Sequence, residues 1–340
     1  MENGRKVCFN VIMANLTLQN HTKTTPSVCQ TLQPFLDMEA RENLPQFYII
    51  MSISTCVISL IMCCTALLLN SVVILAIWRT PSLHQPSHIL LCTLAVADFF
   101  VALTSQPSFM VAELSLIRGK MELYCVAVFI HFYTAWMFNG ISFLTLSAVS
   151  IERYLALRFH LRYTELITTT RVVITVIIYW LIWVTCITLL WFWVKDKLFT
   201  YILVAFCFLI LTVVTRCYVT IFKTVKRHNK QIQDSQLQQG QESIFRYRRT
   251  TNTMVILISA FVLSYFPFII TTAISASQAK EDMKTSAAHC FAVAIISANS
   301  TANPLIYFWR VEELREAAKQ TLRKCHLMTA KQSDVELEPR

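Results

Sequence analysis

The sequence predicts an all-α fold: a bundle of seven transmembrane helices followed by a short amphipathic helix on the cytoplasmic side. Three observations indicate this fold. Hydrophobic residues make up 55% of the 340 residues and charged residues only 15%, whereas soluble domains carry about 25% charged residues. Seven apolar stretches approach or exceed the ~20 residues that cross a bilayer as a helix. Lys and Arg gather on alternate connections between these stretches.

Each apolar stretch is expected to be a helix, because lipid cannot hydrogen-bond to open backbone groups. The predicted spans are 47–77, 86–113, 122–157, 169–193, 198–225, 248–276 and 285–308. The basic connections follow the first, third and fifth spans, and the segment after the seventh span is basic as well. By the positive-inside rule, the N-terminus is predicted to be extracellular and the C-terminus cytoplasmic.

The segments outside the bundle have features of their own. The chain is expected to divide into an extracellular tail (1–46), the bundle (47–308), an amphipathic helix (309–324) and a cytoplasmic tail (325–340). Asn15 and Asn20 begin glycosylation triplets in the first tail. After the bundle, apolar residues recur at helical spacing between charges, which predicts a helix on the inner leaflet. Cys325 follows it and is a candidate for palmitoylation.

Charged residues inside the predicted spans are the first functional candidates. Asp98 lies deep in the second span. Because charge in hydrocarbon is expensive, an ionisable residue there is functional by default. Glu152 and Arg153 stand at the end of the third span, where such a pair is either a boundary marker or a working part.

Several short motifs occur in a fixed order along the spans. They are Glu152-Arg153-Tyr154, Trp180, Tyr218 with Ile221, Phe261 to Pro267 with Tyr265 at its centre, and Asn303-Pro304 with Tyr307. In this order they resemble the rhodopsin-like (class A) G-protein-coupled receptors. Tyr265 replaces the tryptophan that the family usually has, and Ser264 replaces its cysteine. The resemblance implies a plasma-membrane receptor, not an enzyme, that acts on a heterotrimeric G protein and on arrestin.

The resemblance also implies which residues couple to the G protein or switch state. They are Glu152, Arg153, Tyr154, Leu161, Tyr218, Phe261, Tyr265, Pro267, Asn303, Pro304 and Tyr307.

A sodium site is implied by the same resemblance. Its residues are Asp98, Ser142, Asn299, Ser300 and Asn303. Oxygen-rich side chains suit a hard cation, and a buried carboxylate favours a positive partner. The alternative is a hydrogen-bonded network that contains water and no ion. No other cofactor is expected.

A ligand pocket is predicted between the second, third, sixth and seventh spans, near the outer leaflet. Helical spacing and position select Glu113, His131, Ala135, Trp136, Asn139, Tyr265, Thr271, Thr272 and His289. The alternative for any one of these residues is ordinary packing, so the cluster carries the prediction.

The class of ligand is restricted by residues that particular receptor subfamilies carry and that this chain does not. Ala135 stands where amine receptors carry Asp, and Ser297 stands where opsins carry the retinal lysine. A short second extracellular loop without Cys, and no proline in the middle of the fifth span, resemble the melanocortin, cannabinoid, lysolipid and adenosine receptors, with melanocortin receptors nearest. A peptide, a nucleoside and a lipid remain open as ligands.

The usual disulfide between the third helix and that loop cannot form, since the loop has no cysteine. Cys8, Cys29, Cys125 and Cys290 can face the oxidising side. A bridge from the N-terminal segment, preferably from Cys29, to Cys125 or Cys290 is predicted. The alternative is that the latter two are buried small apolar residues.

Two other classes of protein agree less well with the sequence. A transporter or proton pump would need a relay of intramembrane charges, but only Asp98 lies deep in a span. A receptor-shaped decoy would bind ligand without signalling, and the intact Glu152-Arg153-Tyr154 argues against it. No nucleic-acid-binding motif accompanies the basic residues.

Overall fold

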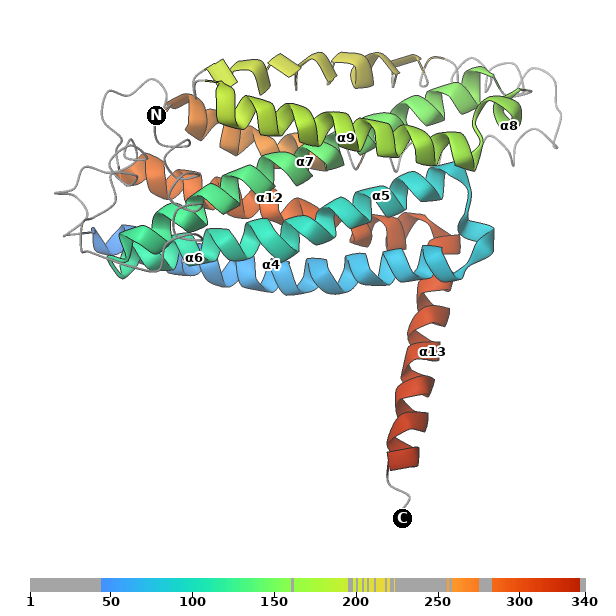
Figure 1. Ribbon diagram of the computed structural model, residues 1–340, viewed down its shortest axis with the longest axis horizontal. Coiled ribbons are helices and arrows are strands. Elements are labelled where there is room, and N and C mark those ends of the chain that lie inside the picture. The colour runs from blue at the N-terminus through green and yellow to red at the C-terminus, as the bar shows by residue number, and fades with distance from the viewer. Residues whose placement is uncertain are drawn as a thin grey trace, which may run out of the picture.

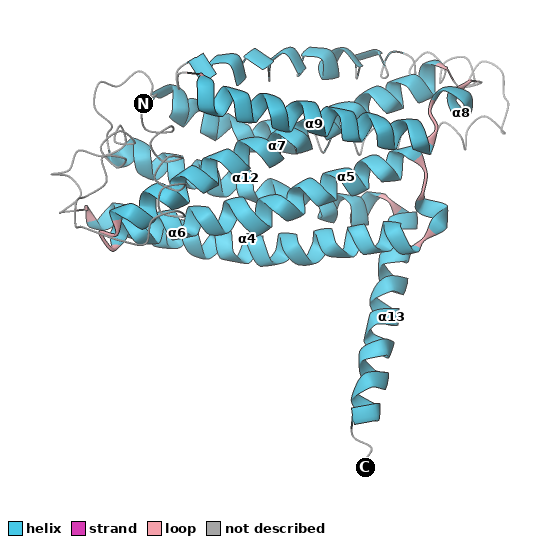
Figure 2. Cartoon of the chain, in the orientation of Figure 1, coloured by secondary structure: helices cyan, strands magenta, loops and turns pink. Residues whose placement is uncertain are grey.

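The computed structural model describes most of the predicted bundle. The described residues are 44–159, 162–194, 198–199, 201–203, 205–206, 208–210, 212–217, 219–220, 223, 256, 259–274 and 283–336. They form helices and turns and contain no β-strand, which confirms the all-α prediction (Figure 2).

Five helical spans are long and apolar enough to cross a membrane. They are α4 (Gln46–Arg79), α5 (Pro86–Phe100) continued through the π-helical turn η2 (Val101–Ser105) into α6 (Gln106–Ile117), α7 (Met121–Arg158), α9 (Thr169–Trp193) and α12 (Met283–Arg310). Two shorter apolar helices, Tyr201–Cys217 and Ser259–Ile274, lie at the predicted fifth and sixth spans. Figure 1 shows these helices side by side, running along the long axis of the molecule.

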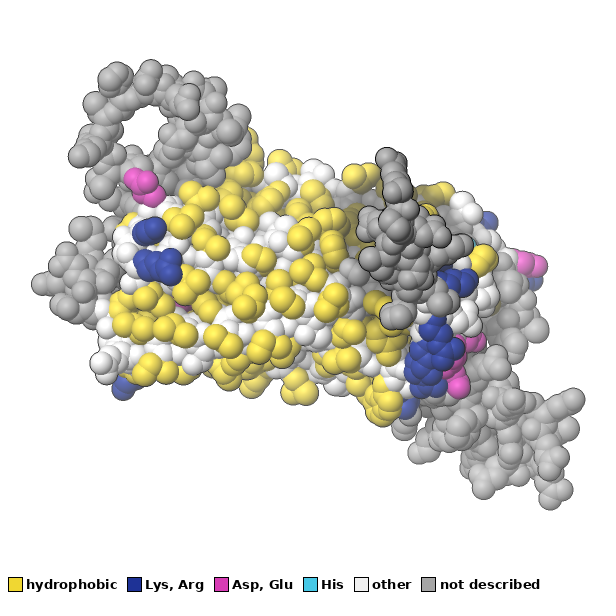
Figure 3. All heavy atoms as spheres, turned by 90° about the horizontal axis from the view of Figure 1, so that it is seen from below, with side chains coloured by type: hydrophobic (Ala, Val, Ile, Leu, Met, Phe, Trp, Pro, Cys, Tyr) yellow, Lys and Arg dark blue, Asp and Glu magenta, His cyan; other side chains and the backbone are white. Residues whose placement is uncertain are grey.

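The outer surface of the bundle is apolar. Large side chains such as Leu68, Leu181 and Phe208 are 63–69% exposed. Hydrophobic side chains spread across the middle of the face in Figure 3, and Lys and Arg gather toward its two ends. A soluble protein would rarely expose such a surface, whereas a bilayer covers it. The chain is a multi-pass membrane protein.

Polar side chains tie neighbouring helices together inside the bundle. Asn70 of α4 donates from Nδ2 to the Ser300 carbonyl of α12, at 3.0 Å. Thr301 of α12 donates back from Oγ1 to the Met62 carbonyl, at 3.1 Å. Such interhelical hydrogen bonds are favoured in lipid because the polar groups have no water to bind.

The second span is interrupted by the π-helical turn η2, which begins three residues after Asp98. Pro107 follows this π-helical turn and has no N–H with which to continue the ladder. The Gln106 N–H instead reaches back to the Val101 carbonyl. A π-helical turn holds more residues than an α-helical turn, so it rotates the helix that follows. The faces presented by α6 are therefore shifted from those of an uninterrupted helix.

A separate helix leaves one end of the bundle. After α12 and Val311, α13 (Glu312–Glu336) runs across the bundle axis (Figure 1). Its first turns bury Leu314, Ala317 and Ala318 against the core. The helix was predicted over 309–324; it begins slightly later and continues past that end, through residues such as Ala, Lys and Glu that favour helix. The Cys325 side chain is outside the described part.

Candidate functional site

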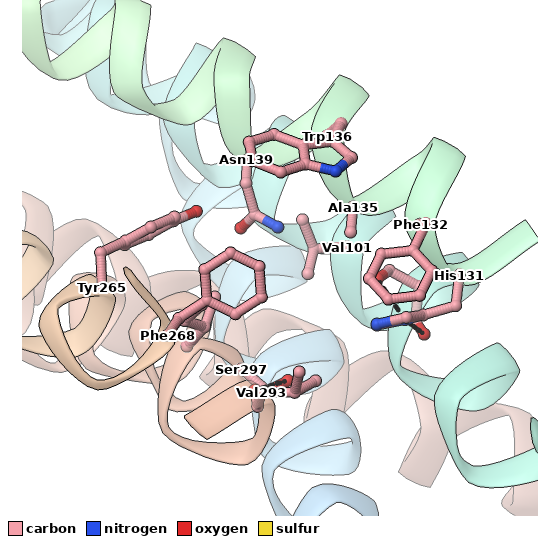
Figure 4. A pocket seen from close by; sticks show the side chains of 12 residues that line it. Val101, His131, Phe132, Ala135, Trp136, Asn139, Tyr265, Phe268, Val293 and Ser297 are labelled. Carbon is pink, nitrogen blue, oxygen red and sulfur yellow. Dashed lines mark hydrogen bonds between the residues drawn. The ribbon is translucent and has the colours of Figure 1, made fainter. Parts of the chain in front are cut away.

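A cavity opens between α7, η2, the Ser259–Ile274 helix and α12. The cavity itself has a volume of about 50 Å³, and together with the open space at its mouth the volume is about 490 Å³. Its wall consists of Val101, Ser105, His131, Phe132, Ala135, Trp136, Asn139, Tyr265, Phe268, Val293, Ile296 and Ser297. Figure 4 shows the Asn139 amide pointing into the space beside Tyr265 and Phe268.

Five predicted pocket residues belong to this wall: His131, Ala135, Trp136, Asn139 and Tyr265. The four on α7 share one face because residues four apart lie one above another on a helix. Sequence reasoning missed the contribution of η2. The proline after this turn was the available signal, since it marks an irregular helix whose side chains are redirected.

Glu113 was expected at the rim, but it is not part of the wall. Its side chain is buried on the far face of α6. Oε2 accepts from Ser52 Oγ at 2.7 Å and from Tyr48 OH at 3.2 Å, both on α4. Oε1 accepts from Cys290 Sγ of α12 at 3.2 Å. Glu113 therefore ties three helices together instead of facing the cavity.

Thr271, Thr272 and His289 were also expected in the pocket, and none of them lines it. Thr271 Oγ1 donates to the Phe268 carbonyl at 3.1 Å and lies 3.2 Å from His289 Nδ1. The His289 ring packs on Phe268, with centroids 5.1 Å apart. Thr271 and His289 therefore lie behind the cavity wall, in contact with Phe268.

Asp98 is fully enclosed below the cavity, with 2% of its surface exposed. Oδ1 accepts from Ser142 Oγ at 3.1 Å, and Oδ2 accepts from Asn303 Nδ2 at 2.7 Å. Three buried oxygens have no hydrogen-bond partner among the described residues: Asn299 Oδ1, Ser300 Oγ and Asn303 Oδ1. The carboxylate and these oxygens are a donor set that suits a hard cation.

Stacked aromatic rings lead from the cavity wall to the middle of α7. Tyr265 lies against Phe261, with centroids 4.4 Å apart and ring planes at 18°. Phe261 stacks in turn on Phe143 of α7, at 4.9 Å and 10°. Phe143 and Phe261 are both buried. A change at Tyr265 can reach α7 through this stack.

At the other end of α7, Glu152 holds two partners. Its Oε2 lies 2.9 Å from Arg153 Nε. Its Oε1 accepts a hydrogen bond from the hydroxyl of Tyr163, which belongs to the short helix α8 (Tyr163–Leu166). Glu152 is buried. The carboxylate therefore joins the end of α7 to the connection that follows it.

The remaining switch residues divide between the core and the undescribed parts. Pro304 and Tyr307 are buried in α12, Pro267 lies in the Ser259–Ile274 helix, and Tyr154 is half-buried on α7. Leu161, Tyr218, Asn15 and Asn20 lie outside the described residues.

The two cysteines considered for the extracellular bridge differ. Cys125, near the start of α7, is disulfide-bonded. Cys290 is a free thiol, so it is not the attachment point; instead it donates to Glu113. Cys29 lies outside the described residues.

The family model described as 7 transmembrane receptor (rhodopsin family) matches residues 69–197 and 183–307. The chain belongs to this family. Human melanocortin receptor 3 is 25% identical over 272 residues, covering 77% of this chain and 83% of the relative. Mouse melanocortin receptor 5 is 24% identical over 277 residues, covering 77% and 81%.

Melanopsin of Branchiostoma belcheri is 24% identical over 293 residues, which are 76% of this chain and 40% of the relative. The expected likeness to melanocortin receptors is confirmed. This rhodopsin-family member is a signalling receptor and not an enzyme, and its partners are a ligand and a G protein.

Proposed function

We propose that this receptor lies in the plasma membrane with its N-terminus outside, binds an extracellular ligand in the cavity, and promotes nucleotide exchange on a heterotrimeric G protein. Arrestin is proposed as a second cytoplasmic partner. The charge distribution supports the orientation. Arg79, Arg158, Arg171 and Arg310 end or begin their helices at the end of the bundle where α8 and α13 lie. The positive-inside rule makes that end cytoplasmic.

The observation that carries the proposal is the stack of Tyr265, Phe261 and Phe143. A ligand can shift an equilibrium only through different contacts in the two states. Tyr265 is part of the cavity wall and Phe143 is part of α7, whose last turns hold Glu152 and Arg153. Ligand contact with Tyr265 thus has a packed route to the cytoplasmic end, and packed cores respond by switching between discrete arrangements.

The resting arrangement contains hydrogen bonds between helices that activation would have to break. Tyr163 holds Glu152 at the end of α7, and Asn303 of α12 holds Asp98 of α5. Moving the Ser259–Ile274 helix outward would separate Phe261 from Phe143. The ends of α7 and α12 could then move, and the two hydrogen bonds would break. An opening between the helix ends would then admit the G protein.

Sodium is proposed as an allosteric ion at Asp98. Asp98, Ser142, Asn299, Ser300 and Asn303 would hold it, since their buried oxygens include three without described partners. The ion would supply the positive charge that a buried carboxylate favours. Binding to the resting state alone would stabilise that state by mass action.

Nucleotide exchange tests the proposal and separates it from a decoy receptor. The full chain would be placed in lipid nanodiscs with purified heterotrimers representing each Gα class, and exchange would be followed without ligand. We expect faster exchange for at least one heterotrimer, and loss of that acceleration in Arg153→Ala at equal amounts of folded receptor. A receptor that accelerates none of them, with or without the substitution, would be a decoy.

A further inference from the structure

The cavity wall contains no Asp, Glu, Lys or Arg among the described residues that form it. The two carboxylates of the second span, one on either side of η2, have other partners. Asp98 accepts from Ser142 and Asn303, and Glu113 accepts from Ser52, Tyr48 and Cys290. A charged ligand group would lose its water here without gaining an ion partner, which is far more costly than burying a neutral polar group that finds a hydrogen bond.

Two polar side chains mark the ends of the α7 wall. His131 Nδ1 lies 2.9 Å from the Ser105 carbonyl, which can only accept, and 3.2 Å from the Ser105 hydroxyl, which can accept as well as donate. The carbonyl contact requires that Nδ1 carry the hydrogen. In the neutral ring, Nε2 then keeps its lone pair and acts as an acceptor. No described residue hydrogen-bonds to His131 Nε2 or to the Asn139 amide. Both groups are therefore available to a ligand.

The spacing of these two residues sets a length. Eight positions separate them, which corresponds to about 12 Å along an α-helix. Ala135 stands between them and leaves room because its side chain is a single methyl. The facing wall is mostly apolar, with Phe268, Val293 and Ile296. Tyr265 and Ser297 also belong to it, and the Ser297 hydroxyl donates to the Val293 carbonyl at 3.0 Å. Figure 4 shows His131 and Asn139 at opposite ends of this apolar stretch.

We propose that the ligand is an uncharged, elongated small molecule with an apolar body and a hydrogen-bonding group at each end. A hydroxyl or N–H at one end donates to His131 Nε2. A hydroxyl, carbonyl or amide at the other end binds the Asn139 amide. The apolar body lies over Ala135 against Phe268. This assignment rests on the proposed function, in which the cavity is the ligand site.

Affinity selection with mass spectrometry tests the ligand class. The full chain in nanodiscs would be incubated with a mixture holding equal numbers of uncharged, cationic and anionic small molecules. The mixture includes matched pairs such as 17β-estradiol, with a hydroxyl at each end, and its 3-sulfate. Ala135→Trp fills the cavity. Ile130→Trp adds the same ring five residues earlier on the exposed face of α7, where Ile130 is 39% exposed, and serves as the control.

Compounds retained by the parent and by Ile130→Trp, but lost from Ala135→Trp, define the cavity ligands. We expect them to be uncharged and polar at both ends. Asn139→Leu should weaken their binding about tenfold, because their buried polar group loses its partner, and leave analogues lacking that end group unchanged. Cavity ligands that carry charge, including quaternary amines held by the aromatic rings, would overturn the assignment. So would a mixture from which no compound is lost in Ala135→Trp.

Binding is measured without a G protein, so the two proposals fail separately. If uncharged two-ended compounds bind the cavity but the receptor accelerates exchange on none of the heterotrimers, the ligand class stands and the signalling proposal fails. If exchange depends on Arg153 while the cavity ligands are charged, signalling stands and the ligand class is wrong.

Discussion

Gly140→Ala tests whether α7 and α9 pack as closely as the structure shows. Gly140 is in contact with the indole of Trp183, whose Nε1 donates to the Met137 carbonyl at 3.0 Å. A Cβ at position 140 would stand less than 3.0 Å from three atoms of this ring. The rigid ring would have to leave, or the helices would have to separate.

The expected loss of stability follows from three contributions. Overpacking costs about 1–3 kcal/mol, and the indole N–H left without its acceptor costs about 1–3 kcal/mol. Alanine regains up to about 1 kcal/mol over glycine as a helix former. The net loss is about 1–6 kcal/mol. It would appear as a lower apparent melting temperature in nanodiscs, compared at one scan rate because receptor unfolding is often irreversible.

A double-mutant cycle with Trp183→Phe is the control. The smaller ring has no N–H and leaves more room, so Gly140→Ala should cost less in this background, with a coupling of about 0.5–3 kcal/mol. Equal melting temperatures for the parent and Gly140→Ala would refute the close contact. Additive effects of the two substitutions would also refute it.

Three further predictions concern the buried polar groups. Replacing K⁺ by Na⁺ should lower ligand-free exchange in the parent, and Asp98→Asn should remove this sensitivity; a parent that responds equally to both ions contradicts the sodium site. Tyr163→Phe removes the hydrogen bond to Glu152 and should raise ligand-free exchange about tenfold or more, because one hydrogen bond to a charged group contributes about 1.5–3 kcal/mol. An unchanged rate would show that this hydrogen bond does not restrain activation. Glu113→Leu leaves the Ser52, Tyr48 and Cys290 donors without their acceptor. It should lower the melting temperature more than Glu113→Gln does. The opposite order would mean that the carboxylate does not stabilise the contact between these helices.

The bundle was predictable because hydrocarbon imposes strict requirements on the sequence. Apolar runs had to be helical, and charges at their ends marked where they leave the bilayer. Thr169–Trp193 was predicted with the bounds that α9 has, and the predicted third span, 122–157, lies one residue inside α7 at each end. These limits are set locally, so one sequence is enough to find them.

The direction of individual side chains was less predictable, as Glu113 shows. On a regular helix, the face on which Glu113 lies follows from its distance in sequence from Asp98. The π-helical turn η2 lies between the two residues and changes that face. One extra residue rotates the following face by about 100°. Glu113 consequently turns toward α4 and α12, where the partners that satisfy it are Tyr48, Ser52 and Cys290. Those partners lie far away in sequence, so no local pattern could identify them.

Tyr163 illustrates a second limit. It follows the third predicted span in the sequence, and no role was predicted for it. Its bond to Glu152 depends on how α8 folds back against α7. The cavity residues on α7 were easier to predict. His131, Ala135 and Asn139 lie on one face of a regular helix, and this face does not depend on the neighbouring helices.

The central claim is that the cavity and the cytoplasmic end communicate through Tyr265, Phe261 and Phe143. Ligand-free nucleotide exchange, measured in a double-mutant cycle of Ala135→Trp and Phe261→Ala, tests it most directly. Filling the cavity should change the exchange rate at least about twofold in the parent background, which corresponds to about 0.4 kcal/mol, while Ile130→Trp leaves it unchanged. In the Phe261→Ala background, the same filling should have no effect, because the stack is broken. An effect of Ala135→Trp that is equally large in both backgrounds, or absent from the parent, would contradict the claim.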